Sequence, residues 1–208
     1  MRRRRNRSNQ IKGQKVMPTE VIRVQGVCDG SGATHLAIGL ANFLASKERY
    51  RVAIVELREE SELAQMLEGD MFVADGLVGF THQLVDYYPK VTWEEATGLR
   101  QKHYDYLLFL YPPANRGLDF PAECHRQIIV GSLKPWSYRE YQKFMRDFYL
   151  KEDVLRWDLY GLFLNENEAN RFEAEFHVPI RTLPFIENPF HLQSKDVAFL
   201  QQVLTSWQ

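Results

Sequence analysis

The feature of this sequence that most constrains its fold is an apolar strand that runs directly into a glycine-rich turn and then a helix. Residues 21–27, VIRVQGV, form a β-branched, apolar run typical of a buried strand. The segment CDGSGA breaks this strand, and residues 34–48, THLAIGLANFLASKE, have the apolar spacing of a helix. Leu36, Leu40 and Phe43 fall on one helical face, whereas Ala37 is small enough for close packing on a sheet.

Further along the chain, apolar runs alternate with amphipathic stretches. Strands are predicted at 51–57, 104–113, 125–133, 159–165 and 180–186, and helices at 61–68, 92–101, 137–151, 166–176 and 194–207. Residues 70–91 are predicted to form short strands or a hairpin, because Gly76 and Gly79 lie near their middle. Strands that alternate with helices predict an α/β fold, in which helices cover both faces of a mostly parallel sheet.

Length and composition limit the class of protein. The chain has 208 residues, of which 45% are hydrophobic, and this is enough apolar material for one packed domain. No apolar run reaches the roughly 18 residues that span a bilayer, and no apolar region follows the basic start as in a secretory signal. The two cysteines, Cys28 and Cys124, lack the spacing of a disulfide framework or a metal site. We therefore expect a cytoplasmic protein without a metal.

The charge is unevenly distributed. Residues 1–18 are predicted to be a basic, disordered tail, and residues 19–208 the domain. Seven arginines and lysines precede the first acid, Glu20, and give this segment a charge of +7. Because the total charge is −1, the remaining chain carries a charge of −8. Such a tail could hold an anionic membrane surface, at about 1 kcal/mol per basic residue, or it could be solvated without a partner. The acidic body does not favour nucleic-acid binding by the domain.

The glycine-rich turn, residues 26–35, has the composition of an anion site. Gly26, Gly30 and Gly32 let the backbone turn sharply and point its N–H groups inward, and the helix N-terminus adds partial positive charge. In parallel sheets, ligands bind beyond the carboxyl ends of the strands, where this turn is expected to lie. The alternative is that the glycines only permit a tight turn.

This segment resembles the phosphate loop of the ParA/MinD-type P-loop ATPases and the related bacterial tyrosine kinases, which reads roughly KGGxGKTT. Gly30, Gly32 and Thr34 match the motif, whereas Cys28 and Ala33 stand at its two lysine positions. The resemblance implies a P-loop NTPase-like three-layer sandwich with ATP or ADP as its ligand.

Other segments extend the resemblance over residues 21–190. The strand YDYLLFLYPP is similar to the family's YDYIIIDTPP, with Leu110 at the position of the aspartate that organises magnesium and water. Glu56 and Arg58 stand at the family's acidic positions after the second strand. The segment GLFLN ends on Asn165, where the family has an asparagine that contacts the nucleotide base. LPFIENPF resembles a later turn of the family.

The substituted positions change the function that the resemblance implies. Without the lysine, and with Asp29 adding negative charge, the turn opposes phosphate binding. Leu110 cannot hold a metal or orient water, so hydrolysis is not expected. Arg58, His35 or a partner subunit could supply replacement charge.

The expected role is therefore a scaffold or regulator that binds protein partners. It would act as a homodimer through the loop face, or at a membrane-associated assembly such as a pilus or secretion machine. The alternative hypothesis is a weak ATP-binding protein with residual ATPase activity. No residue is predicted to be catalytic. The candidate nucleotide-binding residues are Gly26, Asp29, Gly30, Ser31, Gly32, Ala33, Thr34, His35, Glu56, Arg58 and Asn165.

Two other functions fit parts of the turn. GVCDGSG also matches the GxxxGxG pattern of short-chain dehydrogenases, with Glu56 as the acid that binds the ribose of NAD(P). That class needs a tyrosine followed four positions later by lysine, and no tyrosine of this chain has one. Cys28 could be a nucleophile beside the helix N-terminus. However, Asp29 opposes the thiolate, and Thr34 stands where a phosphatase loop needs arginine.

Overall fold

The computed structural model describes residues 18–57, 61–66, 69–74, 76–100, 104–113, 124–149 and 157–206. The basic tail up to residue 17 and Arg58 lie outside these ranges. The strands are β1 (Glu20–Gly26), β2 (Val52–Glu56), β3 (Asp70–Ala74), β4 (Leu77–His82), β5 (Val85–Tyr88), β6 (Tyr106–Tyr111), β7 (Arg126–Ser132), β8 (Trp157–Leu162) and β9 (Arg181–Leu183). The helices are α1 (Ala33–Ser46), α2 (Leu63–Met66), α3 (Trp93–Leu99), α4 (Pro135–Tyr149), α5 (Glu166–Phe176) and α6 (Ser194–Thr205).

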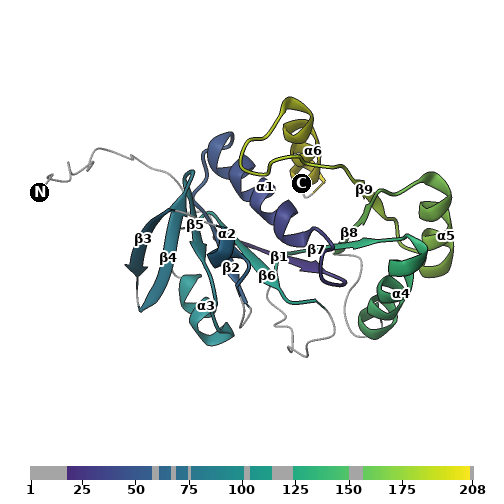
Figure 1. Ribbon diagram of the computed structural model, residues 1–208, viewed down its shortest axis with the longest axis horizontal. Helices are drawn as coiled ribbons and strands as arrows, with labels where there is room; N and C mark the ends of the chain where they lie inside the picture. Colours follow the sequence, from purple (N-terminus) through teal and green to yellow (C-terminus); the bar gives the residue numbers. More distant parts are fainter. Residues whose placement is uncertain are drawn as a thin grey trace, which may run out of the picture.

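The strands form one sheet in the order β3-β4-β5-β2-β6-β1-β7-β8-β9 (Figure 1). The pairs from β5 through β2, β6, β1, β7 and β8 to β9 are all parallel. Among the described strands, only the β3–β4 and β4–β5 pairs are antiparallel. The prediction of a mostly parallel sheet is therefore confirmed, and so is the hairpin predicted within residues 70–91.

Helices cover both faces of the sheet, because successive residues of each buried strand point to opposite sides. Along β6, Leu108 and Leu110 pack in a cluster with α1 and α6, whereas Leu107 and Phe109 pack with α3. Farther along the sheet, Ile129 of β7 packs with α4 and α5. Figure 1 shows α1 and α6 on one side of the sheet and α3 and α4 on the other, and α5 packs with α4 at the β8–β9 end, which is the expected three-layer arrangement.

Helix α1 is more deeply buried than its sequence predicts. The spacing of Leu36, Leu40 and Phe43 indicates a single apolar face, yet every residue from Leu36 to Ala45 is buried. The side away from the sheet is covered by α6 and the segment before it. A Cβ atom on Gly39 would lie 3.4 Å from Ile186 and 3.8 Å from Leu192. The alanines and glycine of α1 therefore serve close packing on two sides.

The helices predicted at 61–68 and 92–101 both begin with a side-chain cap. The Thr92 side chain accepts a hydrogen bond from the Glu95 backbone N–H, and the Glu95 carboxylate accepts one from the Thr92 backbone N–H. Ser61 accepts a bond from the Ala64 backbone N–H at the start of α2. No helix among the described residues combines the length and the apolar character needed to cross a membrane.

Candidate functional site

The glycine-rich turn lies at the carboxyl edge of the sheet, which we define as the edge where the parallel strands end. It connects β1 to α1, and β1 is a central strand between β6 and β7. The Val27 backbone N–H donates to the Val130 carbonyl at 2.9 Å, so the start of the turn is held to β7. Ligands of parallel α/β sheets bind at this edge.

Three glycines of the turn have specific structural roles. Gly30 and Gly32 have φ angles of 72° and 84°, in the left-handed region that favours glycine. At Gly26, an added Cβ atom would overlap the Ser31 hydroxyl and lie 3.0 Å from the Cys28 carbonyl oxygen. Gly26 therefore allows the turn to fold back closely on the end of β1.

The turn leaves the N-terminus of α1 without a side-chain cap. Gly32 is the N-cap residue, and it makes no side-chain hydrogen bond to the helix. The first N–H groups of a helix need an acceptor from outside the helix. A helix N-terminus with such groups attracts anions through its dipole. The backbone of this turn therefore keeps the features of an anion site.

Acidic side chains lie beside this backbone. The Thr34 hydroxyl donates to the Glu62 carboxylate at 2.9 Å. Glu56, at the end of β2, is fully buried and accepts hydrogen bonds from the Ser61 hydroxyl and from the Glu62 backbone N–H at 2.9 Å. Asp29 is exposed on the turn. Together these carboxylates make the surroundings of the turn negative, which disfavours a polyphosphate.

The two positions that the resemblance aligns with lysine and aspartate are both apolar and buried. Ala33 is 5% exposed at the start of α1, and Leu110 is 1% exposed near the end of β6. Both belong to the apolar cluster beneath α1. Neither side chain can hold a phosphate or a metal, so the chemistry of the site rests on backbone groups and on Thr34. Among the described residues, no group of three or more His, Cys, Asp and Glu could hold a metal ion.

Other candidate residues have structural contacts of their own. His35 Nε2 lies 2.6 Å from the Ile186 carbonyl oxygen, so this nitrogen carries the proton and donates it. Asn165 is the N-cap of α5 and accepts from the Glu168 N–H at 2.9 Å. Both oxygens of the Glu56 carboxylate are occupied by the chain's own donors, which does not favour the ribose-binding role of a dehydrogenase acid.

Cys28 is not held in an environment that activates a thiol. Partial burial raises the pKa of Cys28, and the negative charges of Glu140 and Asp29 raise it further. A raised pKa leaves less thiolate at neutral pH, and the thiolate is the nucleophilic form. The structure therefore gives no support to thiol chemistry at this turn.

Sequence reasoning missed a group of exposed aromatic side chains that follow strands ending at the carboxyl edge. Trp136, Phe163 and Phe185 are 79%, 66% and 66% exposed, and they follow β7, β8 and β9, respectively. Phe163 has a φ angle of 51°, which is unusual for a bulky residue. All three residues lie one to four positions after the end of a strand. This shared position is the sequence signal that could have identified them as a group.

Comparisons with known proteins agree with this architecture. No family model matches the chain, and the search of curated proteins found no match. Among solved structures, the MinD cell division protein of Aquifex aeolicus aligns with a TM-score of 0.62 at 15% identity, over 90% of this chain and 97% of that one. A ParA family ATPase of Chlorobium tepidum aligns with a TM-score of 0.61 at 15% identity, over 90% and 92% of the two chains.

A third structure is a putative plasmid partition protein of Borrelia burgdorferi bound to AMPPNP. It aligns with a TM-score of 0.61 at 13% identity, over 91% of this chain and 99% of that one. All three alignments include nearly the whole of each chain, so the similarity extends to the full sheet and its helices. The chain therefore has the ParA/MinD-type fold of the P-loop ATPases.

Proposed function

We propose that this protein is a ParA/MinD-like domain that does not hydrolyse ATP and acts as a scaffold or regulator through protein contacts. One observation carries the proposal: the turn keeps its left-handed glycines, while buried Ala33 and Leu110 stand where the family has its phosphate lysine and its magnesium aspartate. Phosphoryl transfer depends on these charges to stabilise the transition state.

The surroundings of the turn support this proposal. Glu62 holds the Thr34 hydroxyl, the group that would otherwise be free to bind magnesium. Asp29 adds a further negative charge. ATP with magnesium would therefore meet repulsion and few charged partners. The three exposed aromatic residues add apolar area to the same edge, and such area is a common feature of protein contact sites.

A second candidate function is weak ATP binding with residual hydrolysis. It is favoured by the uncapped N-terminus of α1 and by the backbone of the turn, which can bind phosphate without side chains. One structural neighbour is described as an ATPase, and another was solved with AMPPNP. The two candidate functions differ in whether the protein hydrolyses ATP, and hydrolysis can be measured directly.

The test is a calorimetric titration of the purified protein with ATP and Mg²⁺, followed by an assay of phosphate release. We expect no turnover above the buffer blank and either no binding or binding weaker than about 100 μM. The molar mass, measured by light scattering with and without ATP, is expected to be unchanged by the nucleotide. Micromolar binding with steady phosphate release would overturn the scaffold proposal and establish the second candidate.

The basic tail supports a contact with an anionic membrane, such as the surface on which a pilus or secretion machine assembles. The complex of MinC with MinD from Aquifex aeolicus shows that a protein of this fold can bind a protein partner. The tail would add a second contact, at about 1 kcal/mol per basic residue near the surface.

Deletion of residues 1–17 is expected to release the protein from vesicles that contain anionic lipid. The deletion removes all seven basic residues before Glu20. Co-sedimentation with anionic and with neutral vesicles at low and high salt would measure the effect, because electrostatic binding weakens with ionic strength. Equal binding of the full chain and the shortened chain would remove the tail from the proposal.

A further inference from the structure

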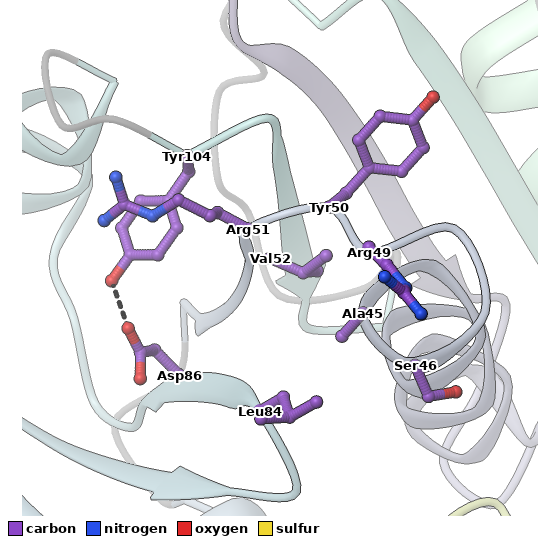
Figure 2. Close-up of a pocket in the computed structure, with 9 residues that line it drawn as sticks. All are labelled: Ala45, Ser46, Arg49, Tyr50, Arg51, Val52, Leu84, Asp86 and Tyr104. Atoms are coloured by element: carbon purple, nitrogen blue, oxygen red, sulfur yellow. Dashed lines mark hydrogen bonds between the residues drawn. The ribbon is translucent and has the colours of Figure 1, made fainter. Parts of the chain in front are cut away.

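A hollow lies at the amino edge of the sheet, the edge opposite the glycine-rich turn. It has a volume of about 430 Å³, within the usual range of small-molecule sites. Its walls come from the end of α1, the start of β2, the β4–β5 turn and the residue range before β6. Figure 2 shows Arg49 and Arg51 on different sides of the hollow, with Leu84 and Asp86 below them.

The two arginines are available to a ligand. Among the residues that the structure describes, the guanidinium groups of Arg49 and Arg51 make no hydrogen bond and no ion pair. The Arg51 guanidinium lies over the ring of Tyr104, 5.7 Å from the ring centre. A planar guanidinium that has no carboxylate partner is well suited to bind a phosphate or carboxylate with two parallel hydrogen bonds.

The one carboxylate of the pocket is already occupied. Asp86 accepts a hydrogen bond from the Thr81 hydroxyl at one oxygen and from the Tyr104 hydroxyl at the other, each at 2.7 Å. Figure 2 shows the bond from Tyr104. Burial raises the pKa of Tyr104, so this hydroxyl remains a donor at neutral pH. The lining residues thus carry two guanidiniums and one carboxylate, and a second carboxylate, that of Asp105, lies beside them and accepts from the Arg51 backbone N–H at 2.7 Å.

Arg49 stands at a position where glycine would be easier to accommodate. Its φ angle is 61°, in the left-handed region. The Tyr50 backbone N–H donates to the Leu44 carbonyl at 3.1 Å, so the chain turns back onto the last turns of α1 at this residue. A backbone outlier beside a pocket is often associated with function. A positive charge at a helix C-terminus also stabilises the helix through its dipole. This simpler role of Arg49 must be tested separately.

We propose that this pocket binds a small organic anion, in which a phosphate or carboxylate is attached to an apolar body. The anionic group would lie between the guanidiniums of Arg49 and Arg51. The apolar body would contact the ring of Tyr104 and the side chains of Val52 and Leu84. The pocket is at the opposite edge from the turn, so this proposal does not depend on the function proposed for the turn.

The experiment is a titration of the full chain, followed by ¹H–¹⁵N NMR, with phenyl phosphate, benzoate and benzyl alcohol as probes. The first two carry different anionic groups on an aromatic ring, whereas the third has no charge. We expect saturable shifts of the backbone amides of Ser46, Arg51 and Leu84 with one or both anions, with a dissociation constant of about 1 mM or lower. The anion that binds more tightly identifies the preferred group.

Two variants and a matched control test the role of the arginines. Arg49→Gly and Arg51→Gln are each expected to weaken binding at least about tenfold, as loss of a charge-assisted hydrogen bond predicts. Arg139→Gln removes one exposed arginine from α4, on the other face of the sheet, and is expected to leave binding unchanged. Arg49→Gly is also expected to leave the melting temperature unchanged or raise it, whereas a role limited to the helix dipole predicts a lower one.

Three outcomes would overturn the proposal. The first is the absence of saturable shifts at the pocket up to about 20 mM of either anion. The second is equal affinity of the wild type and Arg49→Gly and Arg51→Gln for both anions. The third is equal binding of benzyl alcohol, which would show an apolar site without anion recognition.

Discussion

Replacement of Leu110 by aspartate is expected to destabilise the fold by at least about 3 kcal/mol instead of creating a magnesium site. Leu110 is 1% exposed and belongs to the apolar cluster beneath α1. It pairs with Glu56 across the parallel β2–β6 register, so the new carboxylate would lie on the same face as a buried carboxylate. Desolvation and like charge both oppose its ionisation.

The cost of Leu110→Asp is expected to depend on pH. Burial and Glu56 raise the pKa of the new carboxyl in the folded state above about 3.9, its value in the unfolded chain. The folded state therefore binds the proton more tightly, and the variant loses stability relative to wild type as the pH rises from 4 towards the folded pKa. Urea unfolding at pH 4.5 and 7.5 measures this difference.

Leu110→Asn is the matched control for the aspartate variant, because it has nearly the same shape and no charge. Its destabilisation is expected to be the same at the two pH values. If Leu110→Asp is as stable as the wild type and binds Mg²⁺, Leu110 does not block the metal position, and the proposed loss of hydrolysis must have another cause.

Replacement of Ala33 by lysine is expected to strengthen ATP binding by about 10- to 100-fold. A hydrogen bond to a charged group contributes about 1.5–3 kcal/mol, which corresponds to this range of affinity. The turn already provides left-handed Gly30 and Gly32 and an uncapped helix N-terminus, so the missing lysine is the main charge to be supplied. The long side chain can leave the apolar cluster through its flexible stem.

The Ala33→Lys measurement is a calorimetric titration with ATP and Mg²⁺, compared with wild type and with Ala33→Met. Methionine is close to lysine in length and has no charge, so it reproduces the steric cost alone. We expect no gain with methionine. If lysine also gives no gain in a variant that unfolds cooperatively, the negative charges of Asp29 and Glu62 or the closure of the turn dominate, and restoring a single residue is not sufficient.

The sequence predicted best those structural features that depend on interactions between residues close together in the chain. The apolar runs of β1, β2 and β6 and the start of α3 at Thr92 could be identified because each depends on neighbouring residues. The glycines of the turn were identified for the same reason. Gly30 and Gly32 have the positive φ angles that the motif requires.

Features that depend on distant partners could not be predicted. The sequence placed Glu56 at a strand end, but not the hydrogen bonds from Ser61 and Glu62 that occupy its carboxylate. The nucleotide-binding roles assigned to Glu56, Arg58 and Asn165 stay predictions. The pocket at the amino edge was also missed, because Arg49 and Asp86 line the same hollow only after the sheet has formed.

The position of β1 in the sheet sets the order in which the chain can fold. Its neighbours on either side, β6 and β7, follow it by more than 80 and 100 residues: Val21 pairs with Leu107 and Val24 with Ile128. During synthesis, the apolar strand at residues 20–26 therefore stays unpaired until β6, which ends at Tyr111 of the 208 residues, has been made. Such distant pairing slows folding and exposes an aggregation-prone segment in the meantime. The strand that supports the glycine-rich turn is thus also a strand whose two neighbours both come from far along the chain.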